Sequence, residues 1–356
     1  MKIESIQICD LSPDLIARWE NILNQSPELA SPYFRPEYVQ TIAGVRSGVE
    51  VGVLRDGNDV LGFWPFERAP GAVAKLVGSR LSDYQAVIAA ADTPWTVELI
   101  LRGCRLKAWE FDHQLASQTQ LAPYFTSTGE SRHLDLSPGY EQYVEQRKAA
   151  AKTLSETLRK FRKFQREHDV RFVWHSDDEG AFQQLLQWKS EQYVRTGLDD
   201  LFAVGWIVEL IRTIWRTQQP QFAGVLSVMY ANDKIAAVHF SMQSGKRLHS
   251  WFPAYDVGLS KFSPGACQLL FMAQCAAEHG IDCIDLGKGD EEYKLMFASG
   301  SVPLAEGVVE TRPLSAAMRR GWRQTRDWVK QSPLERPARA SLRWLRQVKQ
   351  WIGSQP

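Results

Sequence analysis

Two side chains able to accept a proton lie on neighbouring strand-like segments in the second half of the sequence. His239 lies within AAVHFSM, and Asp256 follows KRLHSWFPAY. Histidine titrates near neutral pH, so it can take the proton that an amine or hydroxyl nucleophile loses. A strand histidine is also compatible with a hydrogen-bonded core residue, and Asp256 with a turn residue that caps the loop at Gly258. His249, one strand further on, is the weaker competitor for the role of base.

A second group of polar residues is the stretch DLGKGDEEYKLMF, residues 285–297. It is not a phosphate-binding P-loop, because the earlier glycine and the hydroxyl residue after the lysine are both missing. Its glycines let the chain turn sharply and approach a ligand closely. We expect Lys288 and Lys294 to bind substrate, Asp290 to take a proton from an acceptor, and Tyr293 to protonate a leaving group. Glu291 and Glu292 suit the start of a short helix, and some of these side chains serve structure alone.

The segment KFSPGACQ, residues 261–268, predicts the start of a helix. We expect Ser263 to be its N-cap and Pro264 its first residue. The free N–H groups of a first helical turn suit a pyrophosphate, although Pro264 lacks an N–H, and an ordinary capped helix is the alternative. The candidate residues for binding such a group are Lys261, Ser263, Gly265 and Ala266.

Around these residues the second half predicts a mixed sheet. Three strands between Phe222 and Tyr255 form an antiparallel meander with two tight turns. The helix from Pro264 ends at Gly280, and the strand Ile281–Leu286 then lies parallel to the third strand of the meander. Upstream we expect a strand at Val170–Trp174 and helices at Asp178–Val194 and Trp206–Arg216.

The first half repeats this order more faintly, which indicates an internal duplication. The expected elements are helices at Leu11–Leu23, Pro36–Ala43 and Pro94–Gly103, a hairpin of Val51–Leu54 and Val60–Phe66, and a strand at Leu106–Phe111. A chain of 356 residues favours two domains. We place them at residues 1–135 and 136–312, followed by a tail at 313–356.

Charge and cysteine content limit the partners. The net charge is +1, so we expect no nucleic acid as a partner. The five cysteines form no CxxC pair and have no histidine at a metal-ligand spacing, so we expect no metal site and a reducing, cytoplasmic location. The start MKIESIQICDL has no apolar signal region, and no run of 18 apolar residues occurs.

Two basic stretches stand out against this balance. Residues 140–166 have apolar residues at helical spacing with Lys and Arg on the remaining face, which indicates a solvated helix or a wall that attracts an anionic ligand. The tail carries ten Lys/Arg, two acids and four tryptophans. It is either a solvated helical pair or a segment that contacts an anionic membrane at its inner face.

The meander and the motifs after it resemble one family. They are Tyr255-Asp256, the helix start Ser263-Pro264-Gly265, and a signature of Asp285, Gly287, Gly289, Tyr293, Lys294 and Phe297. This pattern resembles the acetyltransferase-like family named for cellulose biosynthesis (CelD/BcsL type) in the GNAT superfamily. The detailed match covers roughly residues 150–310. The duplicated layout is similar to the Fem-type aminoacyl transferases.

The resemblance implies an α+β fold of tandem GNAT-like domains, with mixed, mostly antiparallel sheets flanked by helices. It also implies transfer of an acyl group from acetyl-CoA, another acyl-CoA or a related activated donor to an amine or hydroxyl. The implied acceptor is a small molecule or saccharide in exopolysaccharide or cell-envelope polysaccharide biosynthesis. Family members bind the coenzyme A pyrophosphate at an Arg/Gln-x-x-Gly-x-Gly/Ala loop, from which Lys261–Ala266 departs. A catalytically silent accessory protein of a polysaccharide-synthesis assembly at the membrane face is therefore the alternative.

Overall fold

The computed structural model describes residues 1–310, apart from the side chain of Lys152. Residues Met1–Val309 form one compact unit. No helix among the described residues is long and apolar enough to cross a membrane. The tail expected at 313–356 and its contact with a membrane lie outside the described residues, and the domain boundary at 135/136 stays a prediction.

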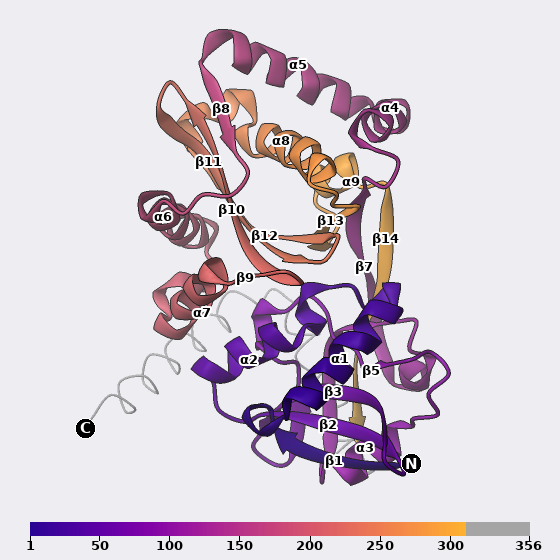
Figure 1. Cartoon of the computed structure of the whole chain (residues 1–356). Coiled ribbons are helices and arrows are strands. Elements are labelled where there is room, and N and C mark those ends of the chain that lie inside the picture. The colour runs from indigo at the N-terminus through magenta and orange to yellow at the C-terminus, as the bar shows by residue number, and fades with distance from the viewer. Residues whose placement is uncertain (311–356) are drawn as a thin grey trace, which may run out of the picture. The chain divides into compact units, whose positions relative to one another are not determined.

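One 14-stranded sheet runs through residues 1–310 (Figure 1). Twelve strands follow the order β1-β2-β3-β4-β6-β14-β7-β13-β12-β11-β10-β8, with β5 beside β3 and β9 beside β10. The strands of the first half are β1 (Lys2–Gln7), β2 (Val49–Asp56), β3 (Asp59–Ala69), β4 (Val73–Lys75), β5 (Ile88–Ala89), β6 (Ala108–Leu115) and β7 (Phe125–Asp135). Those of the second half are β8 (Val170–Val173), β9 (Gln218–Gln219), β10 (Phe222–Ala231), β11 (Lys234–Ser244), β12 (Arg247–Tyr255), β13 (Cys283–Lys288) and β14 (Gly300–Glu310).

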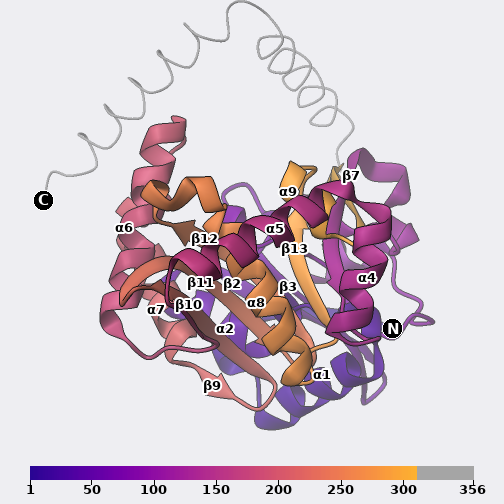
Figure 2. The same cartoon turned by 90° about the horizontal axis from the view of Figure 1, so that it is seen from above.

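Helices cover both faces of this sheet. They are α1 (Pro13–Gln25), α2 (Pro36–Val45), α3 (Val97–Gly103), α4 (Tyr140–Ala150), α5 (Lys152–Glu167), α6 (Glu179–Thr196), α7 (Gly205–Arg216), α8 (Pro264–Glu278) and α9 (Glu292–Phe297). One core cluster joins α1, α2, α6 and α7 to the sheet, while α3 packs in a second cluster and α4, α5 and α8 in a third. Seen from above, α5 lies over α8 (Figure 2), where the rings of Phe161 and Phe271 meet at 4.8 Å.

The internal duplication is confirmed in the order of the elements. Apart from α4 and α5, which open the second half, each half has a strand and two helices, then antiparallel strands, and then a helix and a strand that lies parallel to its neighbour. The parallel pairs are β4 with β6 and β12 with β13. The fold is therefore the tandem arrangement that the sequence predicted.

The two halves exchange their last strands, which the sequence did not indicate. β7 follows β6 in the chain but pairs with β13 of the second half. β14 follows β13 but lies beside β6 of the first half, and β7 and β14 pair with each other. Each half therefore completes the sheet of the other, so separating them would break main-chain hydrogen bonds on both sides.

Two local predictions were wrong. The single helix expected over residues 140–166 is divided, because Ala151 has extended backbone angles between α4 and α5. Ser263 does not cap α8 with its side chain; it lies in the left-handed region at φ 55°. Its hydroxyl lies instead 3.5 Å from the Lys160 Nζ of α5. The first turn of α8 is consequently left without a side-chain cap.

A close approach of α7 to β10 leads to a first prediction. A Cβ on Gly224 would lie 2.4 Å from the carbonyl oxygen of Ile214 and 2.7 Å from Trp215 Cα, so backbone would have to move. We expect Gly224→Ala to lower the free energy of unfolding by about 1–3 kcal/mol, as overpacking does. Gly205→Ala, at the start of α7 with nothing within 4 Å of the added Cβ, is the matched control. Urea denaturation checks this, and equal midpoints for the two variants would contradict it.

Candidate active site

The site begins where two parallel strands separate. β12 and β13 pair only from Arg247 to His249 and from Cys283 to Asp285. β12 continues to Tyr255 and β13 to Lys288, and in the described chain the later residues of β12 pair only with β11. This divergence leaves one edge of the β12 main chain open for a ligand.

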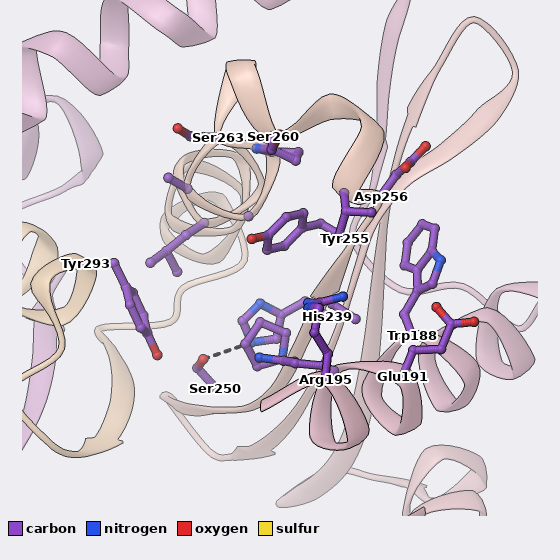
Figure 3. Close-up of a pocket in the computed structure, with 18 residues that line it drawn as sticks. Trp188, Glu191, Arg195, His239, Ser250, Tyr255, Asp256, Ser260, Ser263 and Tyr293 are labelled. Carbon is purple, nitrogen blue, oxygen red and sulfur yellow. Dashed lines mark hydrogen bonds between the residues drawn. The ribbon is translucent and has the colours of Figure 1, made fainter. Parts of the chain in front are cut away.

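A cavity of about 380 Å³ lies at this end of β12 and is called the α8 cavity below. It is formed by the middle of β11, the second half of β12, the start of α8, one face of α6, and α9 (Figure 3). Of the sequence-predicted site residues, the following line it: His239, Asp256, Ser263, Gly265, Ala266 and Tyr293. Its volume is that of an ordinary small-molecule site, which is roughly 300–1,000 Å³.

His239 lies at the inner end of the α8 cavity. Its Nε2 is 2.8 Å from the Ser250 hydroxyl of β12, and the residue is only 3% exposed. Burial, with smaller contributions from the charges of Lys189 and His249, lowers the pKa of His239 to about 3. The imidazole is therefore neutral at physiological pH and can accept a hydrogen bond, although it is a weaker base than an exposed histidine.

The wall formed by α6 was missed in the sequence. Trp188, Glu191, Gln192 and Arg195 line the cavity from this helix (Figure 3). Their spacing of three, four and seven residues indicates a shared helix face, but not that this face lies on a cavity. Lys189, on the same helix, donates to the Gln192 side chain at 2.9 Å, and burial lowers its pKa to about 8.

The start of α8 has the features of an anion site. Gly265 and Ala266 belong to the uncapped first turn and line the cavity. Lys160 of α5 reaches Ser263 from the side, and Lys261 lies in the loop before the helix. Free N–H groups, the helix dipole and two nearby cations together favour a phosphate group.

Asp256 and Tyr293 lie at the cavity on opposite sides (Figure 3). The Asp256 carboxylate accepts a hydrogen bond from the backbone N–H of Gly258 at 2.8 Å. Asp256 therefore caps the loop at Gly258, which was one of its two predicted roles. Tyr293 reaches the cavity from α9. Burial raises its pKa, and the charges of Glu291 and Asp83 raise it further, so the phenol keeps its proton.

Four predicted residues do not line the cavity. Lys288 pairs with Glu306 of β14, and Asp290 is bound by Arg132 of β7 at 2.8 Å. Lys294 is buried, donates to the Lys288 carbonyl at 2.8 Å and pairs with Glu291 at 3.1 Å. Lys261 is exposed beside Glu167 at 4.0 Å. These contacts give Lys288, Asp290 and Lys294 structural partners, so their functional roles remain predictions.

A buried charged network joins the two halves next to this site. Asp285 of β13 accepts hydrogen bonds from Tyr84, from Ser131 at 2.7 Å and from the N–H of Gly287 at 2.8 Å. His249 lies with Nδ1 3.5 Å from Asp285 and with Nε2 2.9 Å from Asp83 of the first half. A Cβ on Gly287, whose φ is 76°, would lie 2.9 Å from the Asp83 carboxylate, so this glycine admits the loop of the first half.

The network sets the charges of its members. Burial alone lowers the pKa of His249, but the hydrogen bonds and charges of Asp285 and Asp83 outweigh it and raise the pKa to about 9. Burial opposes the charge of Asp285 as well, yet His249, Tyr84 and Gly287 hold its pKa well below the usual range. His249 is therefore a buried cation between two carboxylates, which does not suit the base role considered for it.

Comparisons with known proteins agree with this architecture. Residues 151–295 match the family model of the acetyltransferase (GNAT) domain. No curated protein matches the chain. The solved structure of FemX is similar over 88% of this chain and 99% of its own, at 9% identity and a TM-score of 0.57.

Two further solved structures show weaker similarity. The C-terminal domain of a putative lysylphosphatidylglycerol synthetase from Agrobacterium fabrum is 14% identical, with 85% of this chain and 93% of that chain covered and a TM-score of 0.49. A tandem GNAT protein from the clavulanic acid biosynthesis pathway is 10% identical, with 88% and 99% covered and a TM-score of 0.47. The chain thus has a GNAT-like fold in which residues 151–295 match the acetyltransferase (GNAT) domain, and this match supports acyl transfer as the reaction class.

Proposed function

We propose that the protein transfers an acyl group from acyl-CoA, or a related thioester, to an amine or hydroxyl in the α8 cavity. The observation that carries the proposal is the position of this cavity. It lies between the open edge of β12 and the uncapped start of α8, with a buried neutral histidine at its inner end. In this proposal these parts would act as an oxyanion donor, a phosphate site and a hydrogen-bond acceptor in one place.

The donor would lie along the open edge of β12. Its pyrophosphate would bind the free N–H groups of Gly265 and Ala266, near Lys160 and Lys261. Its thioester carbonyl would then face the β12 main chain, where a backbone N–H can stabilise the negative charge of the tetrahedral centre.

The chemical step needs one proton to move from nucleophile to leaving sulfur. His239 accepts a hydrogen bond from the attacking amine or hydroxyl and takes its proton as the new C–N or C–O bond forms. The C–S bond then breaks, and the departing thiolate accepts a hydrogen bond from the phenol of Tyr293, which its raised pKa keeps protonated, and takes its proton from solvent. His239, whose lowered pKa makes its protonated form a strong acid, then releases the proton it accepted to solvent, which completes the balance.

For the acceptor we propose a saccharide or sugar nucleotide with a free amine or hydroxyl, of the kind used to build envelope polysaccharides. Support comes from the motif resemblance described above and from the polar α6 wall of Glu191, Gln192 and Arg195, which can hydrogen-bond several hydroxyls.

Thiol release tests the function directly. The full chain would be incubated with acetyl-CoA and longer acyl-CoA thioesters and a panel of amino sugars and nucleotide sugars, and free thiol would be followed with a colorimetric reagent. We expect acceptor-dependent thiol release with at least one pair. No release with any pair, together with no heat of binding for any acyl-CoA by calorimetry, would reject the proposal.

The lysines at the start of α8 give a separate prediction about the donor. We expect the double variant Lys160→Gln, Lys261→Gln to weaken coenzyme A binding roughly two- to thirtyfold, because exposed ion pairs contribute about 0.2–1 kcal/mol each. The loss should shrink at high salt, since screening weakens exposed charges. Lys234→Gln, at the exposed start of β11, is the control. Unchanged affinity of the double variant at low salt would remove these lysines from the donor site.

A further inference from the structure

A second cavity, of about 410 Å³, lies between the two halves and is called the β14 cavity here. The first half contributes Ser31, Tyr84 and Ala116, and the second half contributes Arg247 and Val302. It shares no lining residue with the α8 cavity. Its volume also falls within the range of small-molecule sites, roughly 300–1,000 Å³.

The lining of the β14 cavity is mostly apolar, with polar groups gathered on a few residues. Leu115 and Ala116 at the end of β6 and Val302 and Pro303 of β14 form apolar wall. Arg247 is the cation of the lining. Glu28, the carboxylate of the lining, is exposed, so water screens its charge.

Two polar groups of this lining lack partners. Among the described residues, the Nε of Arg247 and the hydroxyl of Ser31 are buried without a hydrogen-bond partner. Ser31 is 4% exposed, so its hydroxyl is shielded from bulk water. An unpaired buried donor costs about 1–3 kcal/mol, and such a group calls for an explanation, of which a missing ligand is one.

A need to neutralise the charge of Asp285 does not explain why Arg247 is at this position. Its Nη1 is 3.9 Å from Asp285, beyond hydrogen-bonding distance. Asp285 already accepts from Tyr84, Ser131 and Gly287 and lies beside the cationic His249. The planar fork of an arginine binds a carboxylate through two donors, and that capacity is not used within the described residues.

We propose that the β14 cavity is a binding site for a small carboxylate with an apolar chain. The carboxylate would accept from Arg247 and Ser31, and the chain would lie against Ala116 and Val302. This site is separate from the proposed acyl-transfer site. Its test uses no acyl donor, so the failure of either proposal leaves the other standing.

Calorimetry with hexanoate and with 1-hexanol tests the charge requirement on the full chain. We expect hexanoate to bind with 1:1 stoichiometry and at least tenfold more tightly than 1-hexanol. Arg247→Gln should weaken hexanoate binding by tenfold or more, because a charge-assisted hydrogen bond is lost. Arg171→Gln, which removes an exposed arginine of β8, should leave the affinity unchanged.

Two more variants decide in which cavity hexanoate binds. They keep the proposal testable even if Arg247→Gln unfolds the protein. Ala116→Phe fills the β14 cavity without touching the charged network and should abolish hexanoate binding. Ala266→Trp narrows the α8 cavity and should leave binding intact. The proposal is overturned if hexanoate does not bind the parent protein, if 1-hexanol binds equally well, or if Ala266→Trp rather than Ala116→Phe removes binding.

Discussion

Replacement of His239 by glutamine is expected to lower kcat/KM for acyl transfer by about 10²- to 10⁴-fold, the usual contribution of a positioned proton acceptor. Glutamine retains a side chain that can hydrogen-bond Ser250 but cannot take a proton. Steady-state thiol release with the acyl-CoA and acceptor pair found active would measure the loss. Because the residue lies in the interior, circular dichroism and thermal unfolding must show that the variant keeps its fold.

The pH profile separates this role from that of an exposed histidine. Since burial lowers the pKa of His239 to about 3, the imidazole is already neutral near pH 5. A histidine that titrated near pH 6.5 would make kcat/KM fall below that pH, and this fall would be absent from the His239 variant. We therefore expect no such fall in the parent protein. His279→Gln, at the exposed end of α8, is the matched control and should keep full activity. Activity of His239→Gln within threefold of the parent would exclude proton transfer by this residue.

Removal of the Asp285 carboxylate is expected to cost the most stability. Asp285→Asn leaves the size of the side chain unchanged but places the buried His249 cation next to a neutral amide. Breaking one side of a buried ion pair costs about 3–5 kcal/mol. Asp282→Asn is the control, because Asp282 forms an exposed pair with Lys246 at 3.1 Å on the same segment. We expect the control to change the free energy of unfolding by less than about 1 kcal/mol.

The same network predicts how the stability of the parent protein depends on pH. The pKa of His249 is raised from 6.5 to about 9 in the folded protein, so folding favours the protonated ring. This contribution, on the order of 3 kcal/mol, is fully present below pH 6.5 and is lost as pH rises through 9. The urea concentration at the unfolding midpoint should decrease as the pH rises from 6.5 to 9. The decrease should be smaller in His249→Gln. A parent midpoint that stays constant over this range would contradict a cationic His249.

Much of the fold follows from local pattern in the sequence. Strand-like runs rich in apolar residues in β10, β11 and β12, with turn residues between them, predicted the meander that the structure shows. The helix between β12 and β13 implied that these strands lie parallel, which the register confirms. Gly280, at φ 72°, ends α8 as expected of a residue free to adopt the left-handed region.

The site could be predicted in part, for the same reason. His239 lies on β11 and Asp256 directly follows the adjacent strand β12, so local order was sufficient to bring them near the start of α8. The motif lysines at 288 and 294 lie close in sequence to Tyr293, but their backbone directions and partners place them outside the cavity lining. Nothing local indicated that α6 would form the opposite wall, since side-chain spacing shows which residues share a face but not what the face meets.

What the sequence by itself determined is the meander, the helix and strand that follow it and the duplicated order of the elements, because strand and helix periods and turn residues act over a few residues. Only the tertiary structure decided the exchange of β7 and β14, the entry of Asp83 and Tyr84 beside His249 and Asp285, and the β14 cavity between the halves. These features join residues more than a hundred positions apart. They are formed by contacts between distant segments, main-chain hydrogen bonds in the exchanged strands and hydrogen-bonded charges in the buried network, so no local pattern in the sequence encodes them.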